Sequence, residues 1–312
     1  MKIRLGYACI SNALNATSSK TMTYSYYKRG EKTYINDKLN KIILSNFNSL
    51  KEILNYNIRN DISFFRMTSN LIPLITHPNV DFEVYNRYSK QFKEIGNIIK
   101  NNNLRVDMHI DPFCVLNSIN PDTINTSISI LKNAKNMFDA MKINSKLVLH
   151  VGGKTNGKKE GMKRFINNFN LLDKEIQKMI ILENDDKIYN IRNVLKICNT
   201  LNIPMVLDYH HYKCNKNNEK IEDYIEKIFD TWTSTPKIHF SSPKSKKEKR
   251  SHNEYIDCDE FINFIEKIKF IDRDFDIMLE AKGKDDALFR LVRQLKYKTD
   301  YKFVNSTTFL VK

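Results

Sequence analysis

The chain has 312 residues, 41% hydrophobic and 28% charged, a balance typical of a globular protein that can bury a substantial core. No apolar stretch approaches the roughly 20 residues that a membrane span needs, and residues 1–10 lack a signal-peptide core. These features exclude a membrane protein, and we expect an intracellular monomer, cytoplasmic and associated with the nucleoid.

The formal charge of +15 favours a polyanionic partner such as nucleic acid. A genome-wide bias toward Lys, Asn and Ile would give the same charge without a partner. The five cysteines are scattered and never form a Cys-x-x-Cys pair. This spacing argues against both a disulfide framework and a thiolate zinc site.

Eight short apolar segments alternate with amphipathic stretches along the chain. The apolar segments are 3–8, 62–67, 104–110, 146–151, 179–183, 204–208, 237–240 and 275–280. The helical patterns that follow them cover 36–56, 84–100, 123–141, 162–177, 188–201, 221–232, 259–269 and 285–297. This alternation, with no break in composition, predicts an α/β fold, a single (β/α)8 TIM barrel, over residues 1–298. The tail, residues 299–312, either packs on the barrel or frays.

Four inserts without helical or strand periodicity lie at 11–29, 70–79, 112–121 and 241–255. Each follows the carboxyl end of a predicted strand. In a barrel, these ends share one face, where long loops usually line a binding site.

All seven histidines fall at this predicted face, and the predicted helices contain none of them. Three carboxylates reach the same face. The full set of polar strand-end residues is His77, His109, His150, Glu183, Asp208, His210, His211, His239, His252 and Glu280. Such a set of nitrogen and oxygen ligands predicts a site for more than one divalent ion, with Mn, Zn or Co as the candidates.

Glu183 ends the apolar run Met179–Glu183 near the middle of the series, and we expect it to bridge two ions. Lys237 shares a strand face with His239, because residues two apart point the same way. We expect Lys237 to be either a neutral or carboxylated lysine near the ions, or an ordinary ammonium that contacts phosphate.

The insert after the seventh strand holds five cations in seven residues, Lys244, Lys246, Lys247, Lys249 and Arg250. Alone, such a run predicts a solvated loop; beside a metal site it suggests contacts with a phosphate backbone. Tyr7 and Phe113 lie at the same face and are candidates to stack on bases.

Short motifs in this order resemble the UV damage endonucleases, the UvdE or UvsE family, over nearly the whole chain. The matching segments are Arg4–Tyr7, Lys20–Thr23, Pro73–Pro78, His150–Gly153, Leu182–Asp186, Asp208–His211, Thr231–Trp232, Pro236–Ser241 and Met278–Lys282. The resemblance implies an endonuclease IV-like barrel with about two or three divalent ions, usually manganese. It also implies an enzyme that uses metal-activated water to nick damaged double-stranded DNA immediately 5′ to cyclobutane pyrimidine dimers and related lesions.

Carried over by position, the resemblance assigns catalytic roles to Glu183, Lys237 and His77. The implied metal ligands are His109, His150, Glu183, Asp208, His211, His239, His252 and Glu280. The choice of His211 comes from the family, whereas strand alternation alone favours His210.

The chain departs from the family after His109, where Pro112 replaces the usual Gln that probes the lesion, while Phe113 keeps the usual aromatic residue. We still expect these two residues, with Tyr7 and the basic run, to contact the damaged DNA. The alternatives are an apurinic endonuclease, a metal-dependent sugar isomerase-like barrel, or a damage-binding protein without activity.

Overall fold

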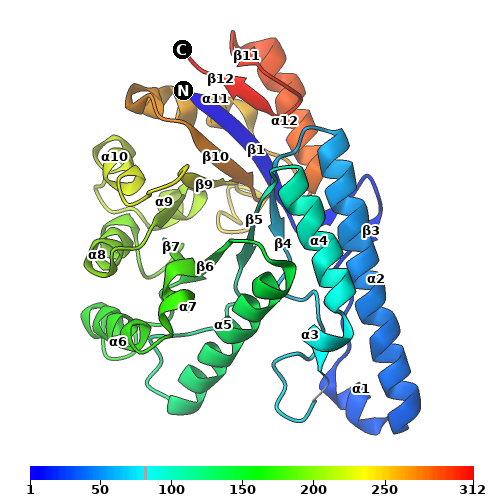
Figure 1. Ribbon diagram of the computed structural model, residues 1–312. Coiled ribbons are helices and arrows are strands. Elements are labelled where there is room, and N and C mark those ends of the chain that lie inside the picture. The colour runs from blue at the N-terminus through cyan, green and yellow to red at the C-terminus, as the bar shows by residue number, and fades with distance from the viewer. Residues whose placement is uncertain (81–82) are drawn as a thin grey trace.

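The computed structural model describes residues 1–80 and 83–312 and confirms the predicted barrel (Figure 1). Neighbouring strands pair in parallel in chain order, and β10 pairs with β1 to close the ring. The barrel strands are β1 (Lys2–Ala8), β4 (Phe64–Met67), β5 (Arg105–His109), β6 (Lys146–His150), β7 (Ile180–Glu183), β8 (Met205–Asp208), β9 (Lys237–Phe240) and β10 (Phe275–Leu279).

Helices surround the barrel, and α2 and α4 lie side by side against one flank (Figure 1). They are α1 (Tyr24–Arg29), α2 (Lys32–Arg59), α3 (Val84–Arg87), α4 (Ser89–Asn101), α5 (Pro121–Met141), α6 (Lys158–Asn170), α7 (Lys174–Met179), α8 (Ile191–Leu201), α9 (Tyr209–Asn215), α10 (Ile225–Phe229), α11 (Cys258–Ile268) and α12 (Lys284–Lys298). Two short 3₁₀ turns, η1 (Ile221–Asp223) and η2 (Lys269–Ile271), complete the helical set.

Four helical expectations need correction. The pattern at 221–232 comprises the 3₁₀ turn η1 and the short helix α10, which ends at Phe229. The pattern at 162–177 is two helices, because the Asp173 side chain accepts the Glu175 backbone N–H and starts α7 separately. The pattern at 84–100 divides at Tyr88 into α3 and α4. The insert at 11–29 also holds α1, which Thr23 caps at its N-terminus, and the short hairpin of β2 (Ile10–Ser11) and β3 (Ala16–Thr17).

Strand alternation directs the site residues into the barrel. Val148, Ile181 and Val206 form a fully buried cluster with Trp232. Since side chains two residues apart share a face, the residues two positions later on β6, β7 and β8 point into the same interior, at its carboxyl end. Burial of each such aliphatic side chain contributes about 1.5–3 kcal/mol, which fixes the strand register.

The tail packs on the barrel. Strand β12 (Thr308–Leu310) pairs antiparallel with the start of β1, and β11 (Lys302–Phe303) pairs with β12. Thr307 also donates to the backbone carbonyl of Asp61 at 2.6 Å. In the described ranges, no helix combines the length and apolarity needed to cross a bilayer.

Candidate metal centre and DNA-contact loops

Six predicted ligands meet at the carboxyl end of the barrel. His109, His150, Glu183 and Asp208 are the last residues of their strands, His239 lies within β9, and Glu280 directly follows β10. The same strand geometry that closes the barrel therefore assembles the cluster.

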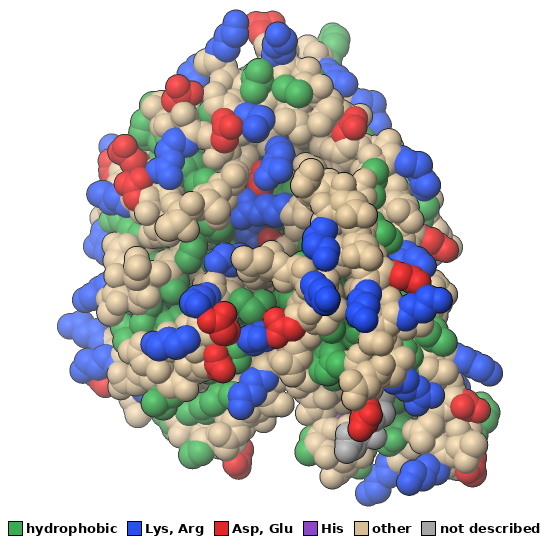
Figure 2. Space-filling model, in the orientation of Figure 1, with side chains coloured by type: hydrophobic (Ala, Val, Ile, Leu, Met, Phe, Trp, Pro, Cys, Tyr) green, Lys and Arg blue, Asp and Glu red, His purple; other side chains and the backbone are tan. Residues whose placement is uncertain are grey.

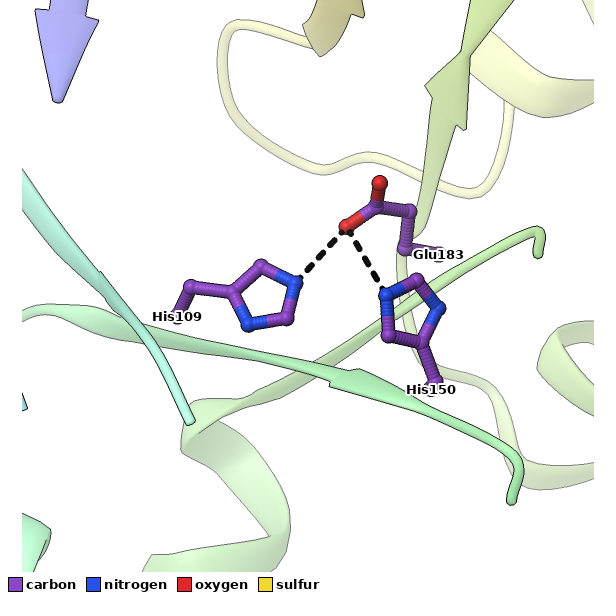
Figure 3. A group of neighbouring side chains, drawn as sticks. All are labelled: His109, His150 and Glu183. Carbon is purple, nitrogen blue, oxygen red and sulfur yellow. Dashed lines mark hydrogen bonds and ion pairs between the residues drawn. The ribbon is translucent and has the colours of Figure 1, made fainter. Parts of the chain in front are cut away.

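Glu183 is the centre of this group. Its Oε2 lies 3.1 Å from His109 Nε2 and 3.9 Å from His150 Nε2, and both rings point at the carboxylate in Figure 3. Its Oε1 lies 3.1 Å from His239 Nδ1 and 3.4 Å from His211 Nδ1. The side chain is 1% exposed, so these imidazoles replace water as its partners.

Two sets of donor atoms are compact enough to hold a cation. One comprises His109, His150 and Glu183, and the other Glu183, Asp208, His239 and Glu280; within each set the donor atoms lie within 4.8 Å of one another. Glu183 belongs to both. Mixed imidazole and carboxylate ligands suit Mn, Zn or Co.

Unpartnered buried atoms in the cluster fit a bound cation. Among the described residues, Oδ2 of Asp208 has no hydrogen-bond partner, and the ring nitrogens of His239 make no well-oriented hydrogen bond, although Nδ1 lies 3.1 Å from both Glu183 Oε1 and Glu280 Oε1. Buried polar atoms without partners are costly, and a metal ion would accept their lone pairs. The ring of His109 is already oriented, because Nδ1 lies 2.9 Å from the Ile110 carbonyl, which leaves Nε2 facing Glu183.

The electrostatics differ between the ligands: they favour an ionised Glu183 beside neutral His150 and His239. In contrast, burial raises the pKa of Asp208, and the neighbouring carboxylates overcome burial to raise the pKa of His211 to about 11. Burial alone raises the pKa of Glu183, but nearby His239 and His150 hold that pKa well below its usual range. Burial lowers the pKa of both His150 and His239, although Glu183 opposes the effect. Neutral imidazoles and ionised carboxylates are the protonation states that ligate metals.

His211 lies in the cluster and His210 does not. The chain leaves β8 directly into α9, where the Asp208 Oδ1 accepts the His211 backbone N–H at 2.6 Å. This turn brings His211 Nδ1 to 3.7 Å from Asp208 Oδ2, while His210 packs behind it. The expectation that helices hold no histidine is therefore wrong, because both residues belong to α9.

His252 and Glu280 close the ring on the side of β9. His252 Nδ1 lies 3.8 Å from Glu280 Oε2, and an isolated bridge to Pro243 holds the residue at the base of the loop. Glu280 also pairs with the buried guanidinium of Arg66 on β4. Sequence reasoning missed Arg66, although a charge inside the apolar run Phe64–Met67 was a signal.

Lys237 does not lie at the rim. It is the first residue of β9, is fully buried, and its Nζ donates to Asp107 of β5, a partner that the sequence did not reveal. Burial lowers the pKa of Lys237, and Asp107 opposes this shift. The pairing favours the ammonium form, since a carboxylated lysine would place a second negative charge beside Asp107.

His77 lies apart from both donor sets. In the loop after β4, its ring stacks on Tyr24 of the α1 segment with ring centroids 3.6 Å apart. Its Nδ1 accepts the Asn79 backbone N–H at 3.2 Å. These contacts link the loop to α1.

The structure contradicts the predicted lesion contact of Tyr7. This side chain has no exposed surface, and its hydroxyl donates to Asn57 Oδ1 of α2 at 2.7 Å. It points outward from the barrel into the helix layer. Phe113 differs, because it is 77% exposed and follows Pro112, also exposed, in the loop beyond His109.

The basic run at 244–250 is exposed throughout. Lys244 pairs with Glu248 at 2.7 Å, and Arg250 pairs with Asp186 at 3.2 Å. Lys246, Lys247 and Lys249 make no ion pair within the described ranges. Lys and Arg side chains also spread over the face in Figure 2, consistent with the net charge.

Comparisons with known proteins show the family of the chain. A family model described as UV-endonuclease UvdE matches residues 3–308. A UV DNA damage endonuclease of Bacillus mycoides is 38% identical over 314 residues, covering 99% of both chains, and one of Bacillus cereus is 38% identical over 95% of both.

Two solved structures share the barrel fold of this chain. The crystal structure of SacUVDE is similar, with a TM-score of 0.87 and 32% identity over 95% of this chain and 98% of that one. Endonuclease IV of Thermus thermophilus has a TM-score of 0.58 at 11% identity, covering 95% of this chain and 100% of that one, which is a likeness of fold alone. The chain belongs to the UvdE family of UV endonucleases.

Proposed function

We propose that this protein is a metal-dependent DNA repair endonuclease that hydrolyses the phosphodiester bond immediately 5′ to UV photoproducts. The observation that best supports this function is that the buried carboxylate of Glu183 belongs to two sets of metal-donor atoms at the mouth of the barrel. The relatives named UV DNA damage endonuclease support the same substrate. Cyclobutane pyrimidine dimers are the expected lesion.

The chain's own residues prepare the centre. His109, His150 and Glu183 would hold one ion, and Glu183, Asp208, His239 and Glu280 a second; His211 and His252 flank them. When bound, such ions, with manganese as the expected metal, lower the pKa of water and offset charge on a phosphoryl group. Arg66 holds Glu280 in position through their buried ion pair.

Two exposed loops would handle the DNA. Phe113 presents an apolar ring that can enter the duplex beside the lesion, where unstacking costs least because pairing is already disturbed. The exposed lysines at 246, 247 and 249 would contact backbone phosphates, which position the duplex without reading its sequence. Pro112 would fix the direction of the Phe113 loop, since its ring restricts the backbone. We further propose that His77, through its stacking on Tyr24, orders the neighbouring loop over the DNA.

A panel of three labelled duplexes tests the function. One carries a single pyrimidine dimer, the second an abasic site, and the third no lesion. With manganese present we expect cleavage of the dimer duplex, and we expect EDTA to stop it. Cleavage of the abasic duplex alone would instead identify an apurinic endonuclease. Turnover of a ketohexose with no cleavage of DNA would identify a sugar-converting barrel.

A further inference from the structure

His210 is a buried polar residue that the metal cluster does not use. It is 1% exposed, and neither ring nitrogen makes a well-oriented hydrogen bond among the described residues, although the ring lies near the backbone of Arg250. A buried imidazole normally satisfies at least one nitrogen, because an unpaired donor or acceptor costs free energy. The position therefore suits a hydrogen bond to a ligand.

His210 lines a pocket of about 710 Å³ that opens beside the metal cluster. One wall comes from α9, through His210, Lys213 and Cys214. The loop at 243–251 and Glu260 of α11 provide the rest of the lining. The volume falls in the usual range for ligand pockets and would admit a phosphodiester together with part of its sugars.

The charge of this pocket selects an anion. Five cations and two carboxylates line it, an excess of three positive charges. Both carboxylates are already paired, Glu260 with Lys213 and Glu248 with Lys244. The free charge therefore lies on Lys246, Lys247 and Lys249, which have no acidic partner in the described part of the chain.

The pocket adjoins the catalytic cluster through one imidazole. The rings of His210 and His252 pack edge to face with centroids 5.4 Å apart. The other side of His252 faces Glu280, with Nδ1 3.8 Å from Oε2. A group in the pocket would therefore be separated from the proposed metal ligand Glu280 by the rings of His210 and His252.

We propose that this pocket is a phosphate-binding subsite for a backbone phosphodiester near the one that is cleaved. His210 donates a hydrogen bond to a phosphate oxygen, and the three unpaired lysines balance its charge. The identity of the ligand rests on the proposed function, because a free nucleotide presents the same phosphate chemistry.

Methylphosphonate substitution of single phosphates in the dimer duplex tests the subsite. Binding is measured by fluorescence anisotropy with the full chain carrying Glu183→Gln, so that the DNA remains intact. We expect one neutralised phosphate near the dimer to weaken binding about tenfold to hundredfold, as for a hydrogen bond to a charged group. The protein that carries both Glu183→Gln and His210→Phe should bind the unmodified duplex weakly, because it lacks the imidazole. Neutralising the same phosphate should then change its affinity less than about twofold.

A loop variant guards against misfolding of the His210 variant. Replacement of Lys246, Lys247 and Lys249 by Ala changes only exposed side chains and should show the same loss of sensitivity at that phosphate. The matched control replaces the exposed helical residues Lys196, Lys227 and Lys267 by Ala, which removes equal charge and leaves the sensitivity intact.

The possible outcomes separate the ligand sources. Equal methylphosphonate profiles with and without His210 overturn the proposal. Titration of a deoxynucleoside monophosphate provides the second arm. If His210→Phe weakens binding of this nucleotide but no methylphosphonate position in the duplex depends on His210, the assignment of the ligand to DNA is wrong. In a third outcome, one methylphosphonate position loses its effect on binding when His210 is replaced, although the wild-type protein fails to cleave the same unmodified duplex. That result would support the subsite and refute the proposed function.

Discussion

Replacement of Lys237 by Met probes the charged interior of the barrel. Lys237 and Asp107 pair with side-chain exposures of 0% and 3%, so Met would leave Asp107 as a buried charge without its ammonium partner. Loss of one member of such a pair costs about 3–5 kcal/mol of unfolding free energy. We expect the lower end, about 3 kcal/mol, because the charge of Arg66 also acts on Asp107.

Urea unfolding of the metal-free protein near neutral pH, followed by circular dichroism, measures this loss. Addition of Asp107→Asn should recover most of it, since the double variant contains no buried charge at this position. Asp107→Asn alone should destabilise the protein if Lys237 is an ammonium, and stabilise it if Lys237 is carboxylated. A loss below about 1 kcal/mol for each single variant, or additive losses in the double variant, would refute the buried pair.

Three further outcomes follow from the site and the core. Glu183→Gln should weaken manganese binding by more than about a hundredfold in equilibrium dialysis, because both donor sets lose a ligand; unchanged stoichiometry would exclude the shared role. Phe113→Ala should reduce the preference for dimer over undamaged DNA about tenfold, whereas Phe270→Ala, at another exposed aromatic, should not. Burial raises the pKa of the Cys198 thiol. Above about pH 8.5 the unfolded thiol ionises while the folded one stays protonated, so stability falls by about 1.4 kcal/mol per pH unit. Cys198→Ala should reduce the alkaline slope in urea titrations by about 1.4 kcal/mol per pH unit, while Cys114, whose pKa burial also raises, keeps its own contribution.

The barrel and the centre of the cluster could be predicted because they depend on local pattern. Short apolar runs separated by amphipathic stretches define parallel strands, and the carboxyl ends of such strands meet at one face. Glu183 ends such a run, so its place followed directly. His109 and His150 follow from the same rule at the ends of β5 and β6.

Other residues depend on contacts that the sequence pattern does not encode. Alternation could not tell whether Tyr7 points to the mouth of the barrel or to Asn57 of α2. The ion pairs of Arg66 and Asp107 could not be predicted, because their partners Glu280 and Lys237 are distant in the sequence and meet them only in the closed barrel.

The separation of His210 from His211 depends on the cap at Asp208. The Asp208 side chain ends the strand pattern at once and starts α9, so strand alternation no longer applies to the two histidines. The family resemblance supplied the choice of His211, and the geometry of α9 gives the physical reason for it.

The central claim is cleavage beside a UV lesion by the Glu183 cluster. The most direct measurement is the position of the nick in an end-labelled duplex with one cyclobutane pyrimidine dimer, incubated with manganese. A single break at the first phosphodiester 5′ to the dimer, with a 3′-hydroxyl that a polymerase extends, is the expected result. An intact duplex, or breaks that occur equally in undamaged DNA, would contradict the account.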